Sequence, residues 1–189
     1  ICRPRLGALV FAGPGLGIFL TGLLALVSHL LNQTSATLWL IYAAAALVMM
    51  LGVWRLLPKP VATAAVAVAA GNPSNRGIGR LAVIYALYGV GYIIPATFLS
   101  QMATGQFHGQ WQADLFWPCF GLAAALGVLL VSLRRHDPET TRHWLMATLW
   151  LQAAGVFACL LGSGLGLALG VILCGTPFLA CMQLVMQRS

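Results

Sequence analysis

Six stretches of about 20 mostly apolar residues follow one another along the chain and leave little room for anything else. They cover residues 6–31, 36–54, 81–103, 115–133, 144–161 and 165–186. A lipid core of about 30 Å is crossed by about 20 such residues in a helix, so each stretch can span a membrane once. The sequence therefore predicts an all-α fold, a polytopic transmembrane bundle of six spans.

The composition agrees with a lipid environment. Hydrophobic residues make up 60% of the chain and charged residues 7%, whereas about a quarter of a soluble domain is charged. The mean hydropathy is +0.91. The spans leave no length for a soluble domain, and the chain begins at Ile1 rather than at a methionine. We expect a segment of a longer integral membrane protein.

The basic residues alternate between the connections. All of them flank or join the spans on one side, and the opposite connections carry none: Arg3, Arg5, Arg55, Lys59, Arg76, Arg80, Arg134, Arg135, Arg142 and Arg188. Because positive charge concentrates in cytoplasmic loops, this pattern predicts that both ends of the segment are cytoplasmic. The net charge of +7 thus reflects topology. Nucleic-acid binding would need these charges gathered with aromatic residues on a water-exposed face.

The connection between residues 55 and 80 is the longest, and Pro58, Pro60 and Pro73 punctuate it. Its Ala/Val-rich part, residues 61–71, is too short to cross a bilayer as a helix. The sequence predicts two helices of one bundle over residues 1–54, a cytoplasmic loop over 55–80 and four helices of a second bundle over 81–189.

The first span contains the run Gly13-Pro14-Gly15-Leu16-Gly17. Small residues allow helix backbones to approach closely, and proline bends a helix where a backbone bond is lost. Generic tight packing explains such a run as well as a family motif does. We single out Gly13, Pro14, Gly15 and Gly17 as a helix-packing or gating motif.

This run resembles the glycine/proline motif in the fifth helix of major facilitator transporters, particularly of proton-coupled exporters. The segment Gly79-Arg80-Leu81, together with residues 88–99, resembles the seventh helix of the YbfB/YjiJ type. The resemblance implies an internal fragment, about helices five to ten, with four helices missing before it and two after it. It implies alternating access, proton-coupled efflux of a small solute, and a bacterial inner membrane.

In the same resemblance, the connection at residues 133–142 falls where the family places a basic loop between helices eight and nine. It keeps Arg134, Arg135 and Asp137, which we take as candidates for that cytoplasmic loop. A glycine-led Asp-Arg-x-Gly-Arg pattern is missing from it.

Several polar side chains inside the spans are candidates for a substrate cavity. Tyr85, Tyr88 and Tyr92 share one helical face, as do Thr176 and Gln183. The resemblance places the two helices that carry them around a central cavity. Filling of gaps and hydrogen bonding between helices are the competing interpretations. The candidates are Tyr88, Tyr92, Thr97, Gln152, Thr176 and Gln183.

The sequence gives less support to proton handling, metal binding or cysteine chemistry. His29, near the outer end of the first span, is expected to be solvated, with proton handling as the alternative. His136, Asp137, Glu139 and His143 match no defined zinc spacing, so no metal and no cofactor is predicted. Four cysteines lie in apolar stretches without Cys-x-x-Cys spacing and are interpreted as packing residues: Cys119, Cys159, Cys174 and Cys181.

We therefore expect a transporter and not an enzyme, since no catalytic couple of residues is visible in the spans. Its expected partners are the lipid bilayer, a small-molecule substrate and protons. The alternative is a six-helix membrane protein that does not transport, either a scaffold or a subunit of an enzyme.

Overall fold

The structure is a computed structural model that describes residues 4–56, 75–132 and 138–188. Its helices are α1 (Pro4–Leu30), α2 (Ser35–Leu56), α3 (Asn75–Gln106), the short 3-10 helix η1 (Trp111–Leu115), α4 (Phe116–Ser132), α5 (Pro138–Cys159) and α6 (Gly164–Arg188). No strand occurs over the described ranges. The prediction of an all-α bundle with six long helices is confirmed.

Four segments are long and apolar enough to cross a membrane: Val10–Leu30, Ser35–Leu56, Trp111–Ser132 and Gly164–Leu184. Helices α3 and α5 are not among them, so their crossing stays a prediction. Both begin six residues before the predicted spans, at Asn75 and Pro138. Hydropathy marks the part of a helix that fits lipid, whereas polar first turns extend the helix beyond it. Proline suits the first position of a helix, because its missing N–H needs no partner there.

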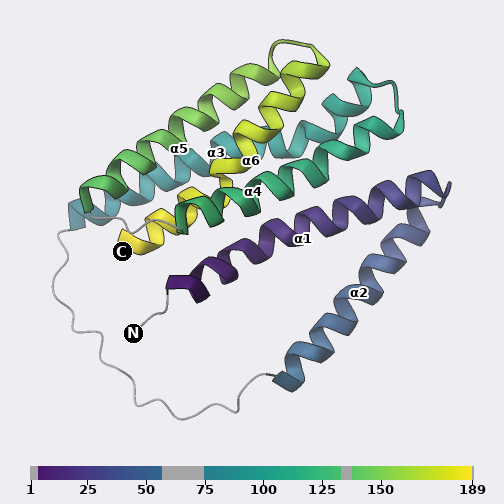
Figure 1. Cartoon of the computed structure of the whole chain (residues 1–189), viewed down its shortest axis with the longest axis horizontal. Helices are drawn as coiled ribbons and strands as arrows, with labels where there is room; N and C mark the ends of the chain where they lie inside the picture. The colour runs from purple at the N-terminus through teal and green to yellow at the C-terminus, as the bar shows by residue number, and fades with distance from the viewer. Residues whose placement is uncertain (1–3, 57–74, 133–137, 189) are drawn as a thin grey trace.

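The three short connections lie at one end of the molecule and both termini lie toward the other (Figure 1). These connections join α1 to α2, α3 to α4 and α5 to α6. The last of them turns at Gly162, whose φ of 61° is easily reached by a residue without Cβ. The helices therefore run up and down, as the predicted alternation of connections requires.

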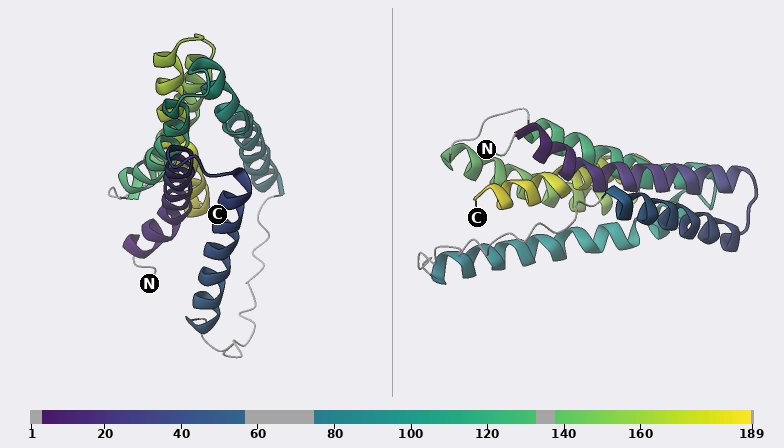
Figure 2. Two further views of the ribbon diagram at one scale, coloured as in Figure 1. Left: turned by 90° about the vertical axis from the view of Figure 1, so that its right-hand side faces the viewer. Right: turned by 90° about the horizontal axis from the view of Figure 1, so that it is seen from below.

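Helices α1, α4, α6 and α5 pack in that order, each extensively on the next. Helix α3 contacts α6, η1, α5 and α4 less extensively, and α2 contacts α1 alone among the described elements. Figure 2 shows α2 and α3 diverging from the packed helices. No residue of α2 is buried. Apolar helix faces fit lipid as well as they fit one another. Close backbone approach and packing therefore decide which helices associate.

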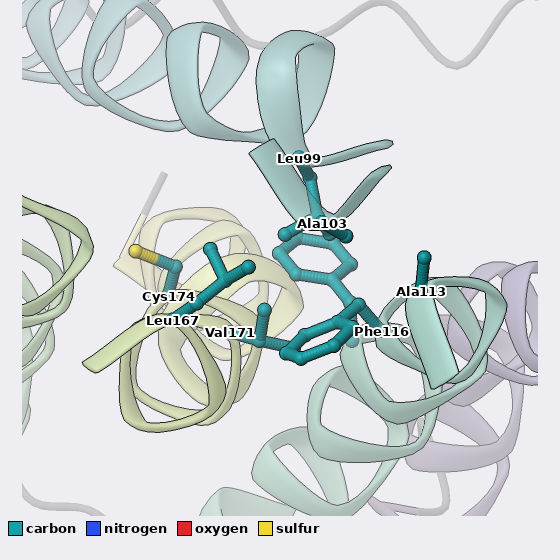
Figure 3. Packing of buried hydrophobic residues seen from close by; sticks show 8 residues of the cluster. Leu99, Ala103, Ala113, Phe116, Leu167, Val171 and Cys174 are labelled. Carbon is teal, nitrogen blue, oxygen red and sulfur yellow. The ribbon is translucent and has the colours of Figure 1, made fainter. Parts of the chain in front are cut away.

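A cluster of buried side chains near the end with the short connections holds α3 to α4 and α6 (Figure 3). Leu99 and Ala103 come from α3, Phe116 from α4, and Leu167 and Val171 from α6. Ala103 is fully buried, which places the backbone of α3 close to its neighbours there. The last turns of α3 are thereby fixed to the bundle.

Candidate functional site

Helices α1 and α4 meet backbone to backbone, and glycines make the contact possible. A Cβ atom on Gly15 would lie 2.7 Å from the nitrogen of Ala125, and one on Gly121 would lie 2.4 Å from the nitrogen of Phe19. Gly22 approaches Pro118 in the same way. We call this contact, formed by Gly15, Phe19, Gly22, Pro118, Gly121 and Ala125, the α1–α4 seam.

The predicted packing motif is only partly at this seam. Gly15 is buried in it, whereas Gly13 and Gly17 face open space and Pro14 is exposed. A role for these three residues stays a prediction.

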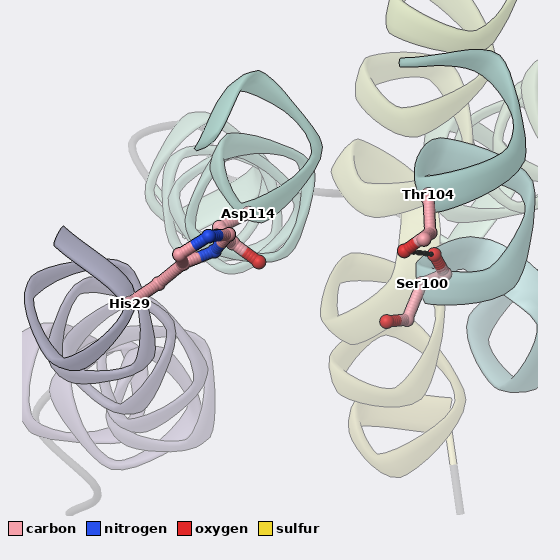
Figure 4. Close-up of polar contacts among 4 residues, drawn as sticks. All are labelled: His29, Ser100, Thr104 and Asp114. Carbon is pink, nitrogen blue, oxygen red and sulfur yellow. Dashed lines mark hydrogen bonds and ion pairs between the residues drawn. The ribbon is translucent and has the colours of Figure 1, made fainter. Parts of the chain in front are cut away.

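An ion pair links the end of α1 to η1, the short helix that leads into α4, beside the short connections (Figure 4). The Nδ1 atom of His29, at the end of α1, contacts the Oδ2 atom of Asp114 in η1. The side chains are 47% and 32% exposed. The side chain of His29 is exposed, as expected of a solvated residue, and its contact with Asp114 was not predicted. The pairing could not be read from the chain, because 85 residues separate the partners.

Tyr88 fastens α3 to α6. Its side chain is buried, and its Oη atom lies 2.8 Å from the carbonyl oxygen of Pro177 and 2.6 Å from that of Phe178, so the hydroxyl donates to these carbonyls. Pro177 lies inside α6 and has no N–H to donate within the helix. The ring of Tyr92 lies 4.4 Å from that of Phe178. The tyrosine face of α3 therefore packs on α6 where that helix contains its proline.

A cavity of about 470 Å³ lies between α3 and α5. Its lining residues come at positions i, i+3, i+4 and i+7 of each helix: Ile84, Leu87, Tyr88 and Gly91 from α3, and Leu149, Gln152, Ala153 and Val156 from α5. This spacing presents one face of each helix to the cavity. Of the predicted cavity candidates, the structure brings Tyr88 and Gln152 together here.

Gln152 is the polar side chain at the centre of this cavity's α5 face. It is 5% exposed, and its Nε2 atom donates to the carbonyl oxygen of Tyr88 over 3.3 Å. Its Oε1 atom is buried and has no hydrogen-bond partner within the described part of the chain. A Cβ atom on Gly91 would lie 2.8 Å from that Nε2 atom, so the glycine makes room for the amide. Gly91 was not among the residues predicted to line a cavity, although its place one turn after Tyr88 was a signal.

The other candidates do not line this cavity. The hydroxyl of Thr97 donates to the carbonyl of Ile93, and that of Thr176 donates to the carbonyl of Ile172, each within its own helix. Gln183 is buried and its Nε2 atom donates to the Oγ atom of Ser132 over 2.8 Å. A role of Tyr92, Thr97, Thr176 and Gln183 in substrate binding stays a prediction. Arg134, Arg135 and Asp137 lie outside the described residues, as does most of the 55–80 loop.

No group of three or more His, Cys, Asp and Glu side chains is placed to hold a metal ion in the described ranges. The thiols of Cys119, Cys159, Cys174 and Cys181 are free. Cys174 and Cys181 are buried between helices, in agreement with packing. What the described residues offer is a backbone seam, an ion pair at its end, and an apolar cavity with one amide.

Comparison with known families identifies the family of the chain. A family model described as "Uncharacterised MFS-type transporter YbfB", where MFS denotes the major facilitator superfamily, matches residues 2–189. Neither the curated proteins nor the solved structures compared with the chain contained a match.

Proposed function

Since the chain belongs to the YbfB-like family of major facilitator transporters, which are membrane transporters, we propose that it moves a small solute by alternating access. The proposed bundles are residues 1–54 and 81–189, joined by the 55–80 loop. In this division α1 belongs to the first bundle, whereas α4 and η1 belong to the second. The α1–α4 seam is then the surface along which the bundles rock.

The ion pair between His29 and Asp114 is the observation that carries this proposal. It joins the two proposed bundles at the end with the short connections. Both side chains are substantially exposed, and such pairs contribute at most about 1 kcal/mol, so rocking can break the contact at little cost. The seam itself is formed by glycine backbones rather than interlocked large side chains, which favours sliding.

The energy source that we propose is a proton gradient, and the direction is efflux. Support comes from the likeness of the Gly13 to Gly17 run to the motif of proton-coupled exporters. The membrane is proposed to be the bacterial inner membrane, with both ends of the segment cytoplasmic, because the basic residues lie on that side. The side with the ion pair is then the outer side.

Cross-linking tests whether the seam opens. In a cysteine-free form of the protein, produced from its complete reading frame, His29→Cys and Asp114→Cys are combined and treated in liposomes with a short bismaleimide. The proposal expects a yield that is incomplete and changes when the pH gradient across the membrane is reversed.

A control pair, His108→Cys with Asp114→Cys, lies within the second bundle and should keep one yield under both gradients. If the His29 and Asp114 positions also cross-link equally under all gradients, the bundles do not rock, and a scaffold or an enzyme subunit becomes the better interpretation.

A further inference from the structure

We propose that the cavity between α3 and α5 binds an uncharged, largely apolar molecule that carries a hydroxyl or an amide group. The cavity lies between α3 and α5, which contact each other much less extensively than α5 contacts α6, and eight residues line it. We call it the α3–α5 cavity.

The lining excludes charged ligands. None of the eight lining residues carries a charge, and five of them are aliphatic: Ile84, Leu87, Leu149, Ala153 and Val156. An ion moved into such surroundings loses its hydration without gaining a counter-charge, which is strongly unfavourable. The Tyr88 hydroxyl is already directed at the carbonyls of α6. An apolar molecule carries no charge and therefore loses no ionic hydration on entering the cavity.

Gln152 supplies the polar contact. Of the hydrogen bonds that a glutamine amide can make, it makes one with the described residues, to the Tyr88 carbonyl. The 3.3 Å length of this bond lies just beyond the usual range of about 2.7–3.2 Å. The Oε1 atom has no partner among the described residues. The terminal torsion of glutamine is broad, so the amide can turn toward a ligand. A hydroxyl or an amide satisfies it, since each can donate to Oε1 and accept from Nε2.

The dimensions favour a small molecule over another helix. About 470 Å³ falls within the range of small-molecule pockets, roughly 300–1,000 Å³. The lining extends over residues 84–91 and 149–156, about two helical turns, whereas a packed helix would follow a longer groove. Leu87, which is 68% exposed, and Ala153 border the open side. A lipid-dissolved molecule can enter from there.

Binding at this cavity does not require transport. Taking the bound molecule as the transported solute does rest on the proposed function. A measurement of occupancy therefore separates the two proposals. If the α3–α5 cavity is occupied but the α1–α4 seam does not move, only the proposed transport is contradicted. If the seam moves but the cavity stays empty, only the proposed binding site is contradicted.

Photolabelling measures occupancy directly. The protein, produced from its complete reading frame and placed in lipid nanodiscs, is irradiated with a ten-carbon diazirine alcohol or with its methyl ether, which cannot donate a hydrogen bond. Labelled peptides are mapped by mass spectrometry. We expect the alcohol to label residues 84–91 and 149–156 about threefold to tenfold more than the ether does, the difference made by one hydrogen bond in an apolar site.

Two variants identify the anchor. Gln152→Leu should still be labelled by both probes but lose the preference for the alcohol, so retained labelling by the ether shows that the cavity persists. Gln112→Leu is the matched control, because Gln112 in η1 carries the other buried amide oxygen without a partner in the described chain and does not line the cavity. This control should keep the preference.

Three results would overturn the proposal. The first is equal labelling by alcohol and ether in the unmodified protein. The second is labelling of other lipid-exposed segments without any labelling of residues 84–91 and 149–156, which is expected if another helix fills the α3–α5 cavity. The third is an unchanged preference in Gln152→Leu.

Discussion

At the scale of single residues, the polar side chains of this bundle mostly bond across or within helices. The pair of Gln183 and Ser132 joins α6 to α4 by a 2.8 Å bond. We predict that a double-mutant cycle with Gln183→Leu and Ser132→Ala gives a coupling free energy of about 0.5–1.7 kcal/mol, the range for such bonds in membranes. Unfolding in mixed micelles titrated with dodecyl sulfate measures it. Additive effects of the two substitutions would show that the pair contributes nothing to packing.

Tyr88 offers a sharper test, because its hydroxyl is buried against two carbonyls of α6. Tyr88→Phe removes the bond and keeps the ring, so the free energy of unfolding should fall by about 0.5–1.5 kcal/mol. Tyr92→Phe is the matched control, since the hydroxyl of Tyr92 has no partner among the described residues while its ring packs on Phe178. Equal losses from the two variants would contradict a specific bond between α3 and α6.

At the scale of helices, the close approach of α1 and α4 depends on a missing Cβ at Gly15. An alanine there would place its Cβ 2.7 Å from a backbone nitrogen, which cannot move without shifting α4. We predict that Gly15→Ala lowers the free energy of unfolding by about 1–3 kcal/mol, as overpacking does. Gly17→Ala, two residues along the same helix in open space, should change it by less than about 0.5 kcal/mol. The same dodecyl sulfate titration compares them, and similar effects would contradict the close approach of the two backbones at Gly15.

The sequence was a good guide to which helices exist and a poor one to where they end. Apolar runs identify the hydrophobic core of each helix, but α3 continues outward to Asn75 and η1 interrupts the path from α3 to α4. Polar turns such as Thr140 to His143 carry no apolar signal, although a helix continues through them.

At the scale of the whole molecule, the partners of each helix could not be predicted. The faces of α1 are apolar all round, so no periodicity says that it packs on α4 and hardly on α2. Likewise Tyr88 and Gln152 were identified as polar residues in spans, but their meeting at one cavity depends on how α3 and α5 are placed. The ion pair of His29 with Asp114 could not be predicted for the same reason, since only the tertiary fold brings its partners together.

Membrane orientation is a property of the whole chain, and the alternation of basic residues predicts it. Single cysteines are placed in a cysteine-free form at Gln33, in the turn between α1 and α2, and at Arg142 in α5, both exposed. In intact bacteria a membrane-impermeant maleimide should label Gln33→Cys fully and Arg142→Cys by less than about a tenth as much, because positively charged ends stay in the cytoplasm. Permeabilised cells should show equal labelling, which controls for reactivity. The reverse labelling pattern in intact cells would show that the topology is the opposite of the predicted one. The ion pair and the adjacent end of the α1–α4 seam would then lie on the cytoplasmic side.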